Sequence, residues 1–186
     1  MRNKFPKRND DKQSGEDVCA GHALGFPLRA ELGFLPIENI TLDVFRCLCD
    51  VYTSGSAQPW EIAIKIAEEN LGAAEGPLLV ARVTALLRAL RAERKLGFSY
   101  LSIGCQHVSS DELAVAGVLK AARARDESAM ERGLTLALDN PQTTARTQFA
   151  ARALAALQSQ HVAAAAHERA DGHELQTQTV QAVYLH

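Results

Sequence analysis

Cysteine and histidine are the residues of this chain whose types and spacing could do chemistry. They form three close pairs in the sequence, which are Cys19 with His22, Cys47 with Cys49, and Cys105 with His107. Thiolate sulfur and imidazole nitrogen are the common ligands of zinc, so the three pairs raise the question of a metal site. Structural zinc sites usually contain paired C-x-x-C knuckles, and this sequence contains no C-x-x-C.

The three pairs are not equally suited to bind a metal ion or to react. Residues two apart on a helix point to nearly opposite sides, so Cys47 and Cys49 are interpreted as small core residues. Cys105 and His107 follow Gly104 in a predicted loop, just before the N-terminus of a predicted helix. The dipole of such a helix lowers the pKa of a nearby thiol. Cys105 and His107 are therefore the candidates for a metal site or a reactive thiol.

The sequence contains none of the common motifs of nucleophilic, phosphate or metalloprotease chemistry. It lacks the G-x-S-x-G elbow, the G-x-x-x-x-G-K-[ST] loop, the G-x-G-x-x-G turn and H-E-x-x-H. The adjacent carboxylates of Asp111 and Glu112 are explained by the preference of acidic residues for the first turn of a helix. The sequence therefore favours a non-enzymatic protein without a cofactor, although catalytic groups need not be close together in a sequence.

The composition of the 186 residues is that of one globular, helical domain. Hydrophobic residues make up 47% of the chain and aromatic residues 5%, with alanine the commonest type, which favours helices packed through small side chains. The formal charge of −2 gives no general attraction to nucleic acid or to an anionic membrane. The polar N-terminus lacks the apolar segment of a secretory signal. We therefore expect a cytoplasmic protein without membrane contact, and the richness in alanine and arginine suggests a bacterial source.

Amphipathic segments predict about six helices. Their predicted ranges are 41–53, 60–71, 77–96, 109–125, 127–138 and 143–167. Thr41 is the expected N-cap of the first helix, and Gly97 is the expected C-terminal cap of the third. Ser109 and Glu112 have the spacing of a capping box at the start of the fourth. The last helix is rich in alanine, and its predicted inner face contains Phe149, Ala153, Leu157 and Ala164.

The fold class predicted from these segments is an all-α, single-domain helical bundle with a flexible N-terminal arm and a C-terminal tail. The arm is residues 1–16, the helical domain 17–168 and the tail 169–186. Residues 17–40 are broken by glycine and proline, so we expect an extended segment with short helical turns lying over the core. Residues 98–103 are expected to be an extended connector, because a lone strand has no partner.

The predicted helix 77–96 has a wide leucine stripe and is expected to lie at the centre of the bundle. A helix that is apolar over so much of its surface belongs in a core or at a subunit interface. The interface candidates on its stripe are Leu79, Val83, Leu86 and Leu90. The favoured function is therefore a regulatory or protein-interaction module that self-associates as a homodimer or binds a protein partner.

A DNA-binding protein of the helix-turn-helix type is the alternative function. The predicted helices 41–53, 60–71 and 77–96 would form the unit, with 77–96 as the reader helix and 98–103 as a wing. The side chains that would contact DNA are Arg82, Arg88, Arg91 and Lys95. The apolar start of 77–96 and the acidic chain make nucleic acid the less favoured partner. The remaining alternative is a thiol- or metal-dependent protein that uses Cys105 and His107.

Overall fold

The computed structural model describes residues 19–140 and 145–181, with side chains described as far as residue 165. The described elements are α1 Ala20–Ala23, the 3₁₀ helix η1 Arg29–Leu32, α2 Pro36–Ser54, α3 Gln58–Glu93, α4 Ser110–Ala124, α5 Glu127–Leu138 and α6 Ala145–Gln181. No strand occurs in these ranges, and residues 98–103 form the expected connector. The predicted all-α, single-domain helical bundle is confirmed, whereas the predicted arm at 1–16 lies outside the described residues.

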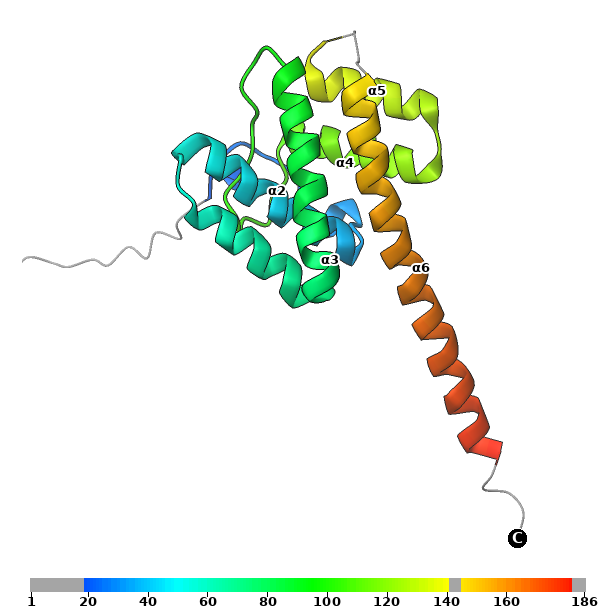
Figure 1. Cartoon of the computed structure of the whole chain (residues 1–186). Coiled ribbons are helices and arrows are strands. Elements are labelled where there is room, and N and C mark those ends of the chain that lie inside the picture. Colours follow the sequence, from blue (N-terminus) through cyan, green and yellow to red (C-terminus); the bar gives the residue numbers. More distant parts are fainter. Residues whose placement is uncertain (1–18, 141–144, 182–186) are drawn as a thin grey trace, which may run out of the picture.

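The bundle is built from α2 with the two arms of α3, the hairpin of α4 and α5, and the long helix α6 (Figure 1). The chain reverses within α3 at Gly72, where φ is +82° and ψ is 169°, so that α3 consists of two helical segments. The two segments correspond to the predicted helices 60–71 and 77–96. Helix α2 packs against α3, α4 packs against α5, and α6 contacts both α3 and α4.

The second segment of α3 occupies the centre of the core, as its leucine stripe predicted. Leu79, Val83, Leu86 and Leu90 are each at most 1% exposed. They belong to one apolar cluster with buried side chains of α2, α4, α5 and α6. These four side chains are therefore enclosed by other helices of the same chain, and a surface for self-association would have to use other residues.

Helix α2 begins at Pro36, five residues before the predicted start at Thr41. Proline suits the first helical position, where its missing N–H is not needed. The N–H of Leu35 donates to the Glu38 carboxylate at 2.7 Å, which closes the first turn. Thr41 lies inside the helix, and its hydroxyl donates to the carbonyl oxygen of Ile37 at 2.7 Å. Thr41 was predicted to be a cap because a threonine hydroxyl can either cap the start of a helix or donate to a carbonyl oxygen one turn earlier within it.

The C-terminal boundaries of α3 and α6 also differ from the prediction. Helix α3 ends at Glu93, and Arg94 follows in an extended conformation, so Gly97 is not its cap. Helix α6 continues to Gln181, past the predicted end near residue 167.

None of the described helices combines the length and the apolar character needed to cross a bilayer.

The predicted inner face of α6 is correct only in part. Leu157 is 5% exposed, as predicted, but Phe149 is 72% exposed, and the fully buried side chains are Ala151, Leu154 and Gln158. An alanine-rich helix carries a weak amphipathic signal, because alanine is compatible with either face. The prediction placed Phe149 on the inner face because it is the large apolar side chain near the start of the helix, and this placement was wrong.

Candidate metal centre

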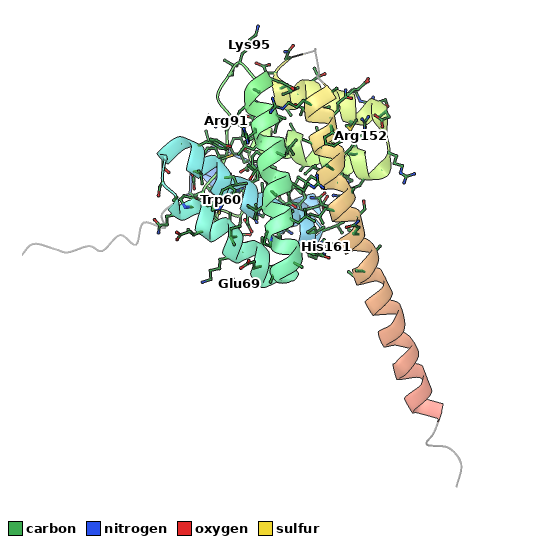
Figure 2. All side chains as sticks on the ribbon, in the orientation of Figure 1. Trp60, Glu69, Arg91, Lys95, Arg152 and His161 are labelled. Carbon is green, nitrogen blue, oxygen red and sulfur yellow. The ribbon has the colours of Figure 1, made fainter. Side chains whose placement is uncertain are left out.

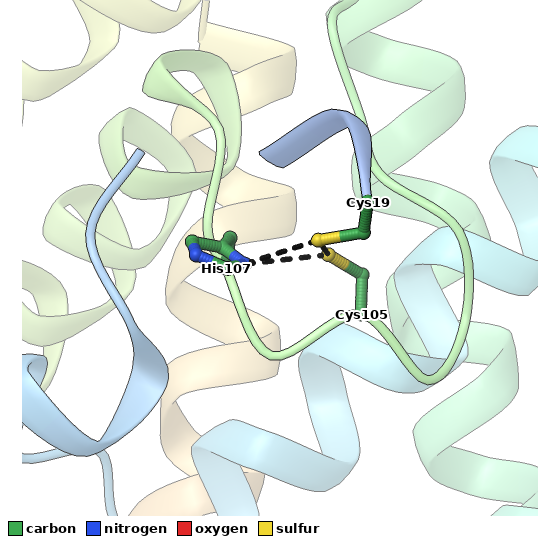
Figure 3. A group of neighbouring side chains, drawn as sticks. All are labelled: Cys19, Cys105 and His107. Carbon is green, nitrogen blue, oxygen red and sulfur yellow. Dashed lines mark hydrogen bonds between the residues drawn. The ribbon is translucent and has the colours of Figure 1, made fainter. Parts of the chain in front are cut away.

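Cys19, Cys105 and His107 come together where the N-terminal segment meets the loop before α4 (Figure 3). The Sγ atom of Cys19 lies 3.3 Å from Nδ1 of His107 and 3.5 Å from Sγ of Cys105. The Sγ atom of Cys105 lies 3.8 Å from the same Nδ1. Cys19 is exposed, His107 is half-buried and Cys105 is buried. The structure thus adds Cys19 to the pair that the sequence predicted.

The three separations fit a single metal ion. With Zn–S of about 2.3 Å and Zn–N of about 2.05 Å, tetrahedral geometry places two sulfur ligands about 3.8 Å apart, and sulfur about 3.6 Å from nitrogen. The observed 3.5, 3.3 and 3.8 Å differ from these values by at most about 0.3 Å. Thiolate and imidazole ligands favour Zn²⁺ and related ions over Mg²⁺ or Ca²⁺. The three side chains could therefore bind a zinc-class ion with little movement.

Cys19 reaches the site because the N-terminal segment pairs with the loop before α4. Residues 27–29 lie antiparallel to residues 106–108, where an isolated β-bridge forms. The two backbone hydrogen bonds of this pairing are Arg29 N–H to the carbonyl of Gln106 at 2.8 Å, and Val108 N–H to the carbonyl of Pro27 at 2.9 Å. The short helices α1 and η1 then place Cys19 over the loop. Residues 19–35 therefore form the segment with short helical turns over the core that the sequence predicted.

Gly21 allows α1 to lie directly on His107. A Cβ atom at Gly21 would be 2.5 Å from Cβ and 2.9 Å from Cγ of His107. Cβ is bonded to the backbone and Cγ follows it directly, so neither can move aside without moving the loop. A larger residue at position 21 would therefore push α1 away and separate Cys19 from the other two ligands.

A buried arginine, Arg46 of α2, holds the loop that carries Cys105 and His107. Its guanidinium donates to the carbonyl oxygens of Cys105 and His107 at 2.6 Å each, and to that of Ser102 at 3.2 Å. It also donates to both carboxylate oxygens of Glu112, at 2.7 and 2.9 Å. Both charged side chains are fully buried. One buried cation thus holds the backbone of both loop ligands in place.

Glu112 completes this arrangement from the first turn of α4. One of its oxygens accepts the N–H of Leu101 at 3.1 Å, and the other accepts the N–H of Ser109 at 2.9 Å. The hydroxyl of Ser109 accepts the N–H of Glu112 at 3.2 Å, so the predicted capping box is confirmed. Preference for the first turn of a helix explains only part of the role of Glu112, because its charge also pairs with Arg46.

The sequence contains one sign of this ion pair, which is an arginine on the apolar face of a helix. Arg46 follows Leu42 by four residues and precedes Cys49 by three, so all three share the apolar face of α2. A cation on such a face requires a buried anion, because an unpaired buried charge is costly. The identity of that anion could not be read from the sequence, since Glu112 lies 66 positions away.

The thiol of Cys19 and the thiols of Cys47 and Cys49 have pKa values that shift in opposite directions. The backbone N–H of His22, followed by a hydrogen bond from the Cys105 thiol, lowers the pKa of Cys19. Burial raises the pKa of Cys47 to about 12, and it also raises the pKa of Cys49. Cys47 and Cys49 are 1% and 5% exposed, so their predicted role as small core residues is confirmed.

The basic residues of the predicted reader helix lie in different surroundings. Arg82 is half-buried and Arg88 is exposed. The guanidinium carbon of Arg91 lies 4.0 Å from the centre of the Tyr52 ring, where the cation stacks on an aromatic face. Lys95 is exposed and follows the end of α3 (Figure 2). DNA binding by these residues stays a prediction.

Two parts of the chain thus supply the candidate ligands, with Cys19 lying 86 positions before Cys105. Cys19, Cys105 and His107 are the group of described residues whose atoms are close enough to share a metal ion. The whole chain was also compared with protein-family models, with curated proteins and with solved structures. None of these three comparisons found a match.

Proposed function

We propose that this chain is a non-enzymatic regulatory module in which a zinc-class ion joins the N-terminal segment 19–35 to the helical body. Cys19, Cys105 and His107 supply three of the ligands. The observation that carries the proposal is that the three interatomic separations suit one tetrahedral ion, although Cys19 and His107 are 88 positions apart. Because such a site does not exist in the unfolded chain, the free energy of metal binding would add to the stability of the folded segment.

A regulatory role is supported by the small number of other contacts that hold this segment. Apart from the thiols and α1, its polar attachments are the backbone pairing of 27–29 with 106–108 and an ion pair between Arg29 and Asp43 at 2.5 Å. The Asn39 amide adds two long hydrogen bonds, of 3.5 and 3.4 Å, to the carbonyl oxygens of residues 34 and 35. Elements held by few contacts open at a low free-energy cost. The presence of the ion would therefore decide how firmly segment 19–35 is docked on the body.

The proposal is tested by zinc titration of the reduced full-length chain, with the bound metal measured after gel filtration. We expect one ion per chain. At free zinc about 1,000-fold above the Kd, we also expect the free energy of unfolding to rise by about 4 kcal/mol. Cys105→Ser removes a ligand and Gly21→Ala displaces Cys19. Each should weaken binding by at least about 100-fold, because loss of an outer-sphere partner alone costs about 10–100-fold.

Gln106→Ala is the matched control for these variants. Gln106 lies between the two loop ligands, but its side chain is exposed and only donates to the carbonyl of Gly104 at 3.3 Å. This variant should bind zinc as the wild type does. A wild-type chain that retains no zinc, or a Cys105→Ser variant that binds it equally tightly, would contradict the proposed site.

The extent of α6 favours self-association as a second role, compatible with the first. The helix continues past the body to Gln181, and Val162 on it is 37% exposed (Figure 1). A helix without tertiary contacts is marginally stable in water, so a second copy packed along it would stabilise it. We expect the full chain to have a dimer mass in light scattering, and a chain ending at residue 165 to be monomeric. A full-length monomer at high protein concentration would reject this role.

A further inference from the structure

We infer that His22 is the fourth ligand, so that the site is a closed tetrahedral centre of two thiolates and two imidazoles for a zinc-class ion. This inference rests on the proposed metal binding by Cys19, Cys105 and His107. Three side chains leave one position of a tetrahedral ion unfilled. In structural zinc sites a fourth side chain occupies it, whereas in catalytic sites water does. The fourth ligand therefore decides to which class the site belongs.

His22 lies in the right place for this role. Cys19 is the N-cap residue of the short helix α1 and His22 is the third residue of that helix. Side chains at these two positions lie close together at the start of a helix, as they do in a capping box. The rings of His22 and His107 meet edge to face, with their centroids 5.8 Å apart and their planes at 85°. Two imidazoles on the same tetrahedral zinc ion have centroids roughly 5 Å apart, so the rings need to approach by only about 1 Å.

The side chain of His22 is able to make this movement. It is exposed, and its ring lies edge-on to the ring of His107. The backbone of α1 need not move, because Gly21 already holds it against the base of His107. Rotation of the His22 side chain is therefore the movement by which an imidazole nitrogen would reach the fourth position.

The charge of the completed centre also suits its surroundings. Two thiolates balance the two positive charges of the ion, and two neutral imidazoles leave the centre without net charge. Cys105 is only 8% exposed, and a neutral centre costs less to bury than a charged one. A fourth ligand with a negative charge would lose this balance, whereas His22 preserves it.

The test uses Co²⁺ as the probe in the reduced full-length chain, with visible absorption as the readout. Four-coordinate cobalt absorbs strongly in the visible range, and five- or six-coordinate cobalt absorbs weakly, so the spectrum reports the coordination number. We expect a strong four-coordinate spectrum from the wild type that azide does not change. His22→Ala should give a weaker spectrum that azide does change, and an affinity for Zn²⁺ lower by at least about 100-fold.

His22→Cys distinguishes ligation from a merely structural role. A third thiolate can occupy the same position, so this variant should recover the four-coordinate spectrum with stronger sulfur-to-cobalt charge transfer. A His22→Ala spectrum that equals the wild type, or an azide-sensitive wild type, would overturn the inference while leaving metal binding intact. A wild type that binds no Co²⁺ or Zn²⁺ would overturn the proposed function, and the inference with it.

Discussion

Replacement of Arg46 by methionine is expected to lower the free energy of unfolding by about 3–5 kcal/mol, because it leaves the carboxylate of Glu112 buried without its cation. The same change removes the hydrogen bonds to the carbonyl oxygens of Cys105 and His107. Zinc affinity should therefore fall as well, even though Arg46 is not a ligand. Urea denaturation of the metal-free chain measures the first effect, and zinc titration measures the second.

Arg152→Met is the matched control, since it removes an arginine from an ion pair at the surface. Arg152 of α6 pairs with Glu127, and their side chains are 48% and 61% exposed (Figure 2). Exposed pairs contribute at most about 1 kcal/mol, so this variant should be nearly as stable as the wild type and should bind zinc unchanged. Equal losses of stability in the two variants would show that Arg46 does not hold the loop as described.

Gly76→Ala is expected to destabilise the chain by about 1–3 kcal/mol through overpacking. A Cβ atom at Gly76 would lie 2.7 Å from the backbone nitrogen of Glu68 and 2.8 Å from the carbonyl carbon of Ala67. Both atoms belong to the backbone of the opposing segment of α3, so they cannot rotate away. The two segments would have to separate, which would expose part of the core around Leu79.

Gly117→Ala is the same substitution in another helix, and we expect it to raise the stability of the chain. A Cβ atom at Gly117 of α4 meets no other atom within 4 Å. Alanine is more stable than glycine inside a helix by roughly 0.5–1 kcal/mol, so this variant should gain stability. Urea midpoints of the two variants and the wild type measure the difference. Gly76→Ala should have the lower midpoint, and a midpoint equal to that of Gly117→Ala would contradict the close contact of the two α3 segments at Gly76.

The sequence by itself determined the helical class, most of the helices and the central position of helix 77–96. These features depend on short-range physics, namely the spacing of apolar residues along one face and the residues that satisfy the end of a helix. Ser109 with Glu112 is such a case, because both partners of the cap lie within one turn. Where the local signal was ambiguous, as at Thr41 or along the alanine-rich α6, the boundary or the register was wrong.

The tertiary structure decided which chemical groups meet. The sequence supplied Cys105 and His107 as candidates and showed the spacing of Cys19 and His22, but the two pairs lie more than 80 positions apart. No local pattern reports that distance in space, since it depends on how residues 27–29 pair with the loop before α4. The same reason hid the partner of Arg46, because a buried ion pair between distant helices exists only after the bundle has closed around it.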